Sequence, residues 1–442
     1  MAQICQPFAD ERPDPFHPSA DDCRLAFFVG AAADLGHCEH WDHSPGLLAV
    51  TPAARVQSAI ELLDSIIAAA RSKGAPADRI LAEWFRAHRF AGSKDRRAIR
   101  ELVYDAIRAC GPVPASGRAA MLRLAQGDEA LSGLFDGSSY GPQAIVQGEP
   151  VAAGGIAPEW LEAALAASDI AGPEAAALLA RAPLDIRVNT LKASRNGIEL
   201  PAEAQRIAAP NGLRVAPGTP VEQWLAYREG LIEVQDGGSQ LACEAVAARP
   251  GETVIDLCAG AGGKTLALAA AMENAGTLIA ADTDRGRLSR LAPRAERAGA
   301  LIAETVLLDP GRELEALAAW KGRADAVLVD APCSGTGTWR RNPEARWRLA
   351  PQDLDRLAGT QARLLEIAAG LVRPGGRLIY VVCSLLDAEG ADQVAGFLAA
   401  HSGWRPGPPA LPLGTPCGTG TRLTPFHDGT DGFFIARLDK AC

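Results

Sequence analysis

The sequence is poor in features that mark several large classes of protein. It has six lysines and 5% aromatic residues, and its 44 basic against 53 acidic side chains leave a net charge of −9. This balance excludes a polybasic nucleic-acid binder as a description of the whole chain, although a local basic face can still exist. The apolar stretch at residues 25–33 is far shorter than the roughly 18 residues of a membrane span, and it lacks the basic start of a secretory signal. We therefore expect a cytoplasmic protein without a membrane contact.

The cysteines also lack the spacing that would define a disulfide scaffold or a zinc finger. There are ten in 442 residues, and none forms a CxxC pair. Reduced thiols are the expectation for such a chain. His37, Cys38, His40 and His43 have no second cysteine pair at finger-like distance, so we expect no bound metal and an irregular extension over residues 1–48.

What remains is a composition typical of two or three folded domains. Apolar residues spaced three and four apart from Thr51 onward predict an all-helical domain over residues 49–180. The β-rich runs at 185–189 and 231–235 predict a small α/β connector over residues 181–240. The final domain is predicted over residues 241–442.

Short β-rich runs alternate with helical windows in this last part of the chain. The pattern predicts a mostly parallel sheet with crossover helices, an α/β architecture. The predicted strands are 253–257, 277–281, 304–308, 326–329, 377–383 and a last, antiparallel edge strand at 433–438. The predicted helices are 264–272, 285–298, 312–320 and 352–372.

The first of these strands enters a glycine-rich turn, DLCAGAGGKT at residues 256–265. A P-loop needs glycine where Cys258 stands, and a dinucleotide fingerprint needs glycine where Thr265 stands, so both fail. The surviving pattern is Asp256 at the strand end and a shorter glycine turn, followed by acids at two further strand ends, Asp282 and Asp309. It is typical of class I S-adenosylmethionine-dependent methyltransferases, a Rossmann-like fold with a mostly parallel seven-stranded sheet.

Two cysteines end the next two strands. Cys333 lies in DAPCS at residues 330–334, and Cys383 lies in YVVCS at residues 380–384. Because the carboxyl ends of parallel strands face one crevice, we expect both thiols beside the cofactor.

These three motifs resemble those of the Sun-type RNA cytosine-5 methyltransferases, most specifically over residues 231–440. The order of helical domain, connector and catalytic domain resembles the bacterial members that modify small-subunit ribosomal RNA. In those members the helical domain is a NusB-type RNA-binding fold. The resemblance implies methylation of carbon 5 of cytidine in RNA, most simply 16S ribosomal RNA, through a covalent cysteine–cytosine adduct.

The resemblance also implies roles for individual residues. Cys383 is the expected nucleophile, and Cys333 assists product release. Asp330 is expected to bind the cytosine edge near the methyl donor, with Lys264 facing the same cleft. Further expected contacts of S-adenosylmethionine are Cys258, Ala259, Gly260, Ala261, Gly262, Gly263 and Lys264 at its amino-acid portion, Asp282 at the ribose, Arg287 after it, and Asp309 at the adenine.

Two arginine-rich stretches are candidate RNA contacts. In the first, Arg96 and Arg97 belong to residues 85–100, which carry six basic residues and one acid. The second follows the DAPCS motif and contains Arg340, Arg341 and Arg346, with Trp339 and Trp347 available to stack on bases. A solvated helix face and a core-packed tryptophan pair are the alternatives for the two stretches.

Other functions stay open at this point. Transfer RNA is an alternative substrate of the same chemistry. A non-catalytic RNA-binding ribosome-assembly factor with a methyltransferase shell is the alternative from another class, and the intact Cys333, Cys383, Lys264 and Asp330 argue against it. We expect a monomer whose partner is RNA.

Overall fold

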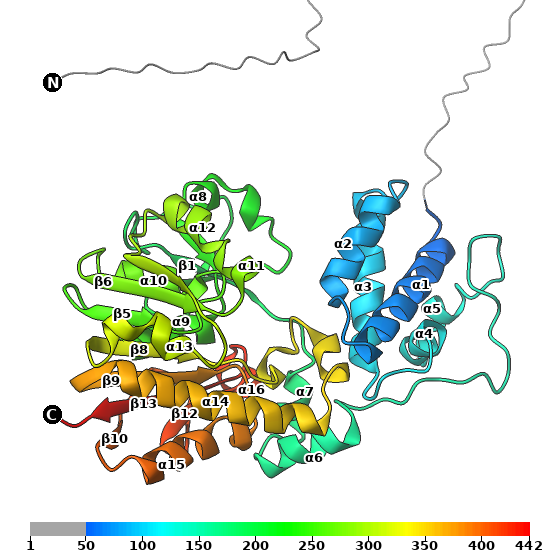
Figure 1. Ribbon diagram of the computed structural model, residues 1–442. Helices are drawn as coiled ribbons and strands as arrows, with labels where there is room; N and C mark the ends of the chain where they lie inside the picture. Colours follow the sequence, from blue (N-terminus) through cyan, green and yellow to red (C-terminus); the bar gives the residue numbers. More distant parts are fainter. Residues whose placement is uncertain (1–49) are drawn as a thin grey trace, which may run out of the picture. The chain divides into compact units, whose positions relative to one another are not determined.

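A computed structural model describes residues 50–442, and the predicted extension at residues 1–48 lies outside this range, together with its histidines and Cys38. Ala49–Cys442 group into one compact unit. The finer domain boundaries at residues 180 and 240 stay predictions. Figure 1 shows the element order along this unit.

The unit begins with helices that share one buried core, as the apolar spacing predicts. Thr51 caps the first of them, because its hydroxyl accepts a hydrogen bond from the Ala54 N–H at 3.2 Å, and Pro52 occupies the first helical position. The helices are α1 (Pro52–Arg71), α2 (Ala77–Ala87), α3 (Ser93–Ala109), α4 (Gly117–Ala125) and α5 (Glu129–Ser132).

The next two helices, α6 (Glu159–Ala167) and α7 (Pro173–Ala177), lie within the predicted helical segment but pack elsewhere. Their buried apolar residues cluster with Trp339, Leu385 and Leu386, which belong to the loops after the two cysteines. By packing, these helices therefore belong with the catalytic-domain loops.

The connector contains a small antiparallel sheet in the order β2-β3-β1-β4, with one short helix, α8 (Leu225–Arg228). The two strands predicted there are present as β1 and β4. The strands are β1 (Leu184–Val188), β2 (Gln205–Arg206), β3 (Gly212–Val215) and β4 (Ile232–Val234).

The large sheet has the order β11-β12-β13-β9-β8-β5-β6-β7, and β10 adds to the side of β13. All six predicted strands are present, and the five from β5 to β9 are parallel, while β13 is antiparallel to β9. The sheet has nine strands and not the predicted seven, because the glycine- and proline-rich segment after α15 adds three short strands to the six predicted by their residues. The strands are β5 (Thr253–Asp256), β6 (Thr277–Asp282), β7 (Glu304–Leu307), β8 (Ala324–Asp330), β9 (Val372–Val382), β10 (Trp404–Gly407), β11 (Thr415–Cys417), β12 (Gly420–Leu423) and β13 (Phe433–Lys440).

Helices cover both faces of this sheet. The predicted helix at 285–298 is divided into α11 and α12, and the others lie close to their predicted places. The helices are α9 (Gly237–Val246), α10 (Gly263–Ala271), α11 (Arg285–Leu288), α12 (Leu291–Ala298), α13 (Glu313–Ala316), α14 (Pro351–Leu371), α15 (Ala391–Ala400) and α16 (Pro425–Asp428).

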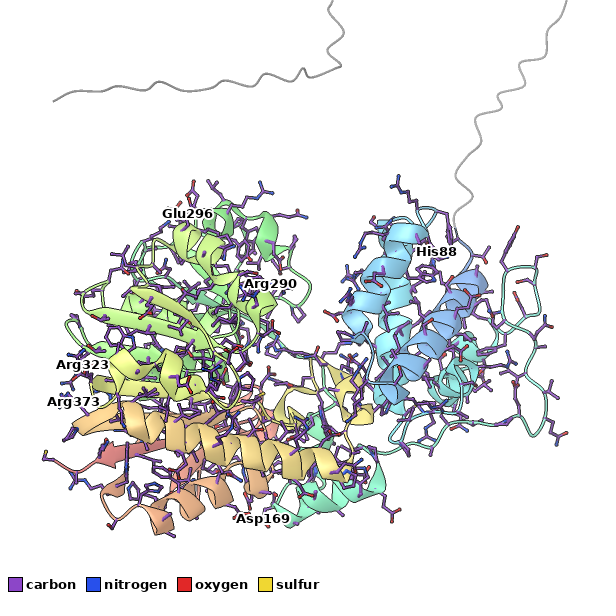
Figure 2. The ribbon with its side chains drawn as sticks, in the orientation of Figure 1. His88, Asp169, Arg290, Glu296, Arg323 and Arg373 are labelled. Carbon is purple, nitrogen blue, oxygen red and sulfur yellow. The ribbon has the colours of Figure 1, made fainter. Side chains whose placement is uncertain are left out.

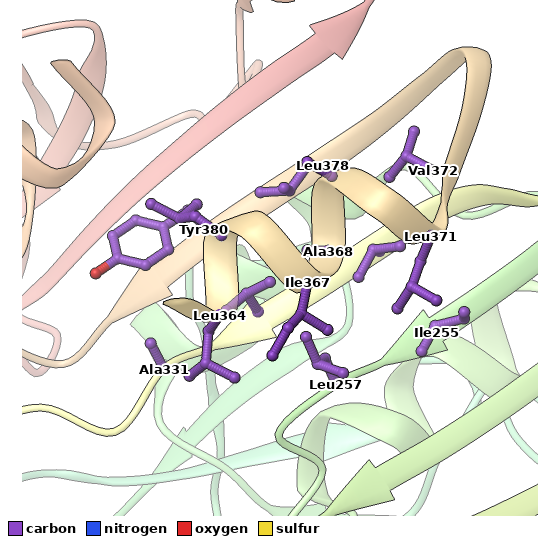
Figure 3. Packing of buried hydrophobic residues seen from close by; sticks show 14 of the residues in the cluster. Ile255, Leu257, Ala331, Leu364, Ile367, Ala368, Leu371, Val372, Leu378 and Tyr380 are labelled. Carbon is purple, nitrogen blue, oxygen red and sulfur yellow. The ribbon is translucent and has the colours of Figure 1, made fainter. Parts of the chain in front are cut away.

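Alternation along the buried strands divides the core between the two faces. Val254 packs on the face covered by α9 and α10, whereas its neighbour Ile255 packs on the face covered by α14. Figure 3 shows Leu364, Ile367 and Leu371 of α14 lying over that second face. The chain runs outward from β5 through β6 to β7 and then returns to β8 on the other side of β5. A ligand cleft is expected at this reversal, outside the carboxyl ends of β5 and β8.

Candidate active site

The glycine turn between β5 and α10 is held in a conformation that side chains would prevent. Gly260 and Gly262 have φ angles of +55° and +85°, in the left-handed region. A Cβ on Gly260 would stand 2.3 Å from the Arg287 guanidinium, and one on Gly262 would stand 2.1 Å from Leu291. At Gly263, by contrast, a Cβ would meet no atom within 4 Å. The backbone at the start of α10 is therefore open to a ligand.

Two strand-end acids support this turn in different ways. Asp282, at the end of β6, accepts a hydrogen bond from the Gly260 N–H at 2.7 Å. Asp256 lies buried beneath the turn and accepts from the Thr265 hydroxyl at 2.7 Å. Burial raises the pKa of the Asp256 carboxyl to about 7. Asp256 thus stabilises the start of α10 from below, while Asp282 is the acid that reaches the cleft.

A cleft of about 420 Å³ lies at the carboxyl ends of these strands. Six of the predicted site residues line it: Cys258, Asp282, Arg287, Asp330, Cys333 and Cys383. Asp309 is exposed, and its neighbours Leu308 and Pro310 line the cleft instead. The structure thus brings the two thiols, Asp282 and Cys258 together, whereas Asp309 and residues 259–264 do not line the cleft.

Four other lining residues were missed by the sequence analysis: Thr283, Glu313, Thr360 and Arg363. Glu313 and Arg363 form an ion pair at the cleft. Burial alone would raise the pKa of the Glu313 carboxyl, but its hydrogen bonds to backbone N–H groups and to Arg363 hold that pKa below its ordinary value. No local motif indicates these residues, because Arg363 approaches from the surface of α14, 50 residues further along the chain.

The two cysteines face each other across the cleft. Cys383 directly follows β9, Cys333 follows β8, and their sulfur atoms are 3.4 Å apart. The thiols are partly exposed and line the same cleft as Asp282. The contact with Cys383, burial and the nearby charge of Glu389 raise the pKa of the Cys333 thiol well above its ordinary value. The third thiol in the cleft lining, Cys258, is also held protonated, because burial raises its pKa well above the ordinary value.

Lys264 and Asp330 form an ion pair beside these thiols, with 2.6 Å between Nζ and Oδ2. Their side chains are 12% and 29% exposed, so water screens the pair only in part. Burial opposes the charge on Lys264, but Asp330 and the surrounding groups hold its pKa above its ordinary value. A cation is therefore fixed beside Asp330, which lines the cleft.

The RNA contacts predicted at Arg340 and Arg346 are wrong. Arg346 is fully buried and donates to the carbonyls of Ile107 and Cys110, both at 2.7 Å. Trp347 is also buried and donates to the Gly111 carbonyl at 3.1 Å. These carbonyls belong to the end of α3, where helical carbonyls have no partner within the helix, so a guanidinium is well placed there.

The other half of this stretch is also committed to internal contacts. Trp339 is fully buried in another hydrophobic cluster than Trp347, so both tryptophans are core-packed, though not against each other, and neither forms a stacking surface. Arg340 is buried and bonds to Asp431 at 3.0 Å. Arg341 is half-buried between Asp431, at 2.6 Å, and Asp236, at 3.1 Å. The segment joins parts of the protein to one another and presents no free guanidinium at Arg340 or Arg346.

The other predicted RNA contacts lie at the start of α3. The Arg97 side chain is 76% exposed and pairs with Glu101 at 3.4 Å, whereas Arg96 packs over the Phe85 ring. Aromatic rings lie close by: His88, labelled in Figure 2, stacks on Trp84 with 4.0 Å between ring centroids. Basic and aromatic side chains thus lie close together at this place, and the RNA contact at Arg96 and Arg97 stays a prediction.

Metal and membrane features can be assessed for residues 50–442 alone. Within that range, no three or more His, Cys, Asp and Glu side chains gather as a metal site would require. None of the helices in the same range is both long and apolar enough to cross a bilayer.

Comparison with known proteins gives consistent matches. The sequence profile of a family described as 16S rRNA methyltransferase RsmB/F matches residues 243–439. Ribosomal RNA small subunit methyltransferase B of Xanthomonas campestris is 37% identical over 232 residues, which are 52% of either chain. The protein of that name from Xylella fastidiosa is 35% identical over 294 residues, which are 64% of this chain and 68% of that one. The crystal structure of PH0851 aligns with a TM-score of 0.68 and 26% identity over 88% of this chain and 99% of that one. Matches to the first three curated relatives span between 52% and 60% of their length.

Proposed function

Because the chain belongs to the RsmB/F family of 16S rRNA methyltransferases, we propose that it transfers a methyl group from S-adenosylmethionine to carbon 5 of a cytidine in 16S ribosomal RNA. The resemblance to the Sun-type family is thereby confirmed at the level of the family. The activity of this chain, its substrate and the roles of its residues are the proposal.

One observation carries the proposal: two thiols touch in a cleft that is also lined by Cys258, just before the glycines of the turn, and by an acid at the end of β6. Cys333 and Cys383 are 3.4 Å apart, and both line the cleft with Asp282. A single buried cysteine is usually a small packing residue. Two thiols in contact at the carboxyl ends of adjacent strands, beside a nucleoside-type site, indicate covalent catalysis instead.

The reaction explains why thiols are needed. Carbon 5 of cytosine is a poor nucleophile until a thiolate, assigned to Cys383, adds to carbon 6 and shifts the electron pair of the C5=C6 double bond to carbon 5. After methylation, a general base takes the carbon 5 proton, the electron pair of that C–H bond re-forms the double bond, and the Cys383 sulfur leaves carbon 6 as a thiolate. Cys333, in contact with that sulfur, assists this release. Asp330 retains one carboxylate oxygen beyond its bond to Lys264 with which to accept from the cytosine amino group.

The residues present fit the methyl donor. S-adenosylmethionine supplies an electrophilic methyl group when bound. The open backbone at Gly263 suits its amino-acid portion. Asp282, which lines the cleft, suits its ribose hydroxyls, because each carboxylate oxygen keeps a second acceptor site beyond its bond to the Gly260 or Asp284 N–H. Arg287 lines the same end of the cleft.

The test is methylation by the purified chain with tritiated S-adenosylmethionine and bisulfite sequencing of the RNA. We expect 5-methylcytidine at one position of 16S ribosomal RNA, supplied as free RNA and as assembling subunits. Label in transfer RNA alone would mean that transfer RNA, and not 16S ribosomal RNA, is the substrate. No label in either RNA would favour the non-catalytic assembly factor. The proposal includes a monomer in the cytoplasm, where bacterial ribosomal RNA is made.

Asp282→Ala should weaken S-adenosylmethionine binding by about 10- to 100-fold, the effect expected when hydrogen bonds to a charged group are lost. The measurement is isothermal calorimetry without RNA. Asp355→Asn, an exposed acid on α14, is the matched control and should bind normally. An unchanged affinity in Asp282→Ala would contradict the ribose assignment.

Cys333→Ala should accumulate a protein–RNA adduct, because Cys383 can still attack carbon 6 while release is slowed. The adduct is measured as a band that survives denaturing electrophoresis and requires S-adenosylmethionine. Cys442→Ala removes an exposed thiol outside the cleft and should leave no such band. Normal turnover without an adduct would remove the release role from Cys333.

Exchanging Arg96 and Arg97 for glutamate should weaken RNA binding and flatten its dependence on salt by about one phosphate contact per side chain. Filter binding at several salt concentrations gives the slope. The control is the same exchange at Lys321 and Arg323, two exposed cations that lie just before β8. An equal loss of RNA affinity in both double variants would mean that the start of α3 is a solvated helix face and not an RNA contact.

A further inference from the structure

A buried carboxylate lies directly behind the two cysteines. Glu389 has no exposed surface, and it accepts four hydrogen bonds. Its Oε1 accepts from the Ser334 N–H at 2.8 Å and from Gln361 at 3.1 Å. Its Oε2 accepts from the Ser384 hydroxyl at 2.6 Å and from the Ser334 hydroxyl.

Three of the four hydrogen bonds to Glu389 come from the residues that follow the two thiols, and the fourth comes from Gln361 of α14. Ser334 comes after Cys333, and Ser384 comes after Cys383, so one carboxylate holds both thiol-bearing loops. Their hydroxyls are 3.2 Å apart, and Thr336 extends the network to Ser384 at 3.1 Å. A backbone bond from the Gly337 N–H to the Cys383 carbonyl, at 3.0 Å, joins the same loops.

The chemistry of this cluster is unusual for a purely structural one. All four donors are neutral, and a buried carboxylate that has neutral partners alone carries a large desolvation penalty. Neutral side chains could join two loops at a lower energetic cost. The carboxylate differs from them in offering four acceptor sites in one plane, which a single amide or hydroxyl cannot do.

We propose that Glu389 is the positioning residue of this active site, whose carboxylate fixes the loops after β8 and β9 against each other and thereby sets the contact between the Cys333 and Cys383 sulfur atoms. The catalytic consequence rests on the proposed function, whereas the positioning itself does not. The charge adds a direction, because it contributes to the raised pKa of Cys333 and so favours the thiol form there.

A probe that needs neither RNA nor cofactor tests the positioning. Dibromobimane becomes fluorescent when it joins two nearby thiols, and peptide mass mapping locates the bridge, which matters because Cys258 also lines the cleft. We expect bridging of Cys333 to Cys383 in the wild-type chain and a rate about tenfold or more lower in Glu389→Gln, because small displacements of reacting groups cost large rate factors. Glu366→Gln, an exposed acid on α14, is the matched control and should bridge at the wild-type rate.

Ser334→Ala and Ser384→Ala each remove one side of the network and keep the test decisive if Glu389→Gln does not fold. They should slow bridging less than Glu389→Gln does. In the methylation assay, Glu389→Gln should lower kcat by about 10- to 100-fold while the KM for RNA and the affinity for S-adenosylmethionine stay unchanged. A role in stability alone would lower the melting temperature and leave bridging and kcat of the folded protein as in the wild type.

The outcomes separate this inference from the proposed function. Folded variants of Glu389, Ser334 and Ser384 that bridge and turn over like the wild type would overturn the positioning role. A wild-type chain that methylates no RNA, but whose thiols need Glu389 for bridging, would overturn the function and leave the positioning role in place.

Discussion

Cys383→Ala is expected to lose methylation by at least about 10⁴-fold, because covalent catalysis has no substitute once the nucleophile is removed. An alanine in this place cannot add to carbon 6, and carbon 5 then stays too electron-poor for alkylation. Cys333 cannot take over readily, since its pKa lies well above the ordinary value and its thiolate is scarce near neutral pH. The measurement is single-turnover transfer of labelled methyl groups with saturating enzyme.

Binding should separate this loss from misfolding. Cys383→Ala removes one sulfur atom at the partly exposed cleft, so calorimetry should show wild-type affinity for S-adenosylmethionine. Cys442→Ala is the matched thiol control and should turn over normally. Turnover in Cys383→Ala at the wild-type rate would refute the assigned nucleophile, and lost turnover in both variants would point to thiol loss in general.

The parts of the candidate active site that the sequence predicts are those placed by strand ends. Asp282, Asp330, Cys333 and Cys383 each follow a β-rich run, and parallel strands bring such positions to one edge whatever the rest of the chain does. Their meeting in one cleft is confirmed, with the two sulfur atoms in contact. Asp309 follows the same rule in sequence, but the turn after β7 presents Leu308 and Pro310 to the cleft instead.

The parts that could not be predicted depend on contacts between distant segments. Composition predicts that Arg346 and Trp347 bind RNA. Their actual partners lie at the end of α3, more than 230 residues earlier, and the local sequence does not reveal this contact. Glu389 likewise has no role in the sequence analysis, because Ser334 and Gln361, two of its partners, lie 55 and 28 residues away in the chain. Its importance becomes visible when four hydrogen bonds link it to both thiol-bearing loops.

Lys264→Met should lower the free energy of unfolding by about 3 kcal/mol, because it leaves the Asp330 carboxylate partly buried without its partner. Methylation should fall as well, by about 100-fold or more, since Asp330 loses the group that orients it toward the substrate. Urea unfolding measures the first effect and single-turnover transfer the second. Lys321→Met, which removes an exposed ammonium, is the control and should change neither.

A double-mutant cycle decides whether the 2.6 Å contact itself is responsible. If Lys264 and Asp330 act as a pair, Asp330→Asn also destabilises the fold, and the Lys264→Met/Asp330→Asn double variant loses less stability than the sum of the single losses, by about 1 kcal/mol or more. The second substitution then removes the charge that the first one leaves partly buried without a partner. Losses that add fully would mean that each side chain contributes through other neighbours, such as the Phe433 ring, which lies 5.8 Å from the Lys264 ammonium. Activity should not recover in the double variant, because both the fixed cation and the carboxylate oxygen are then absent from the cleft.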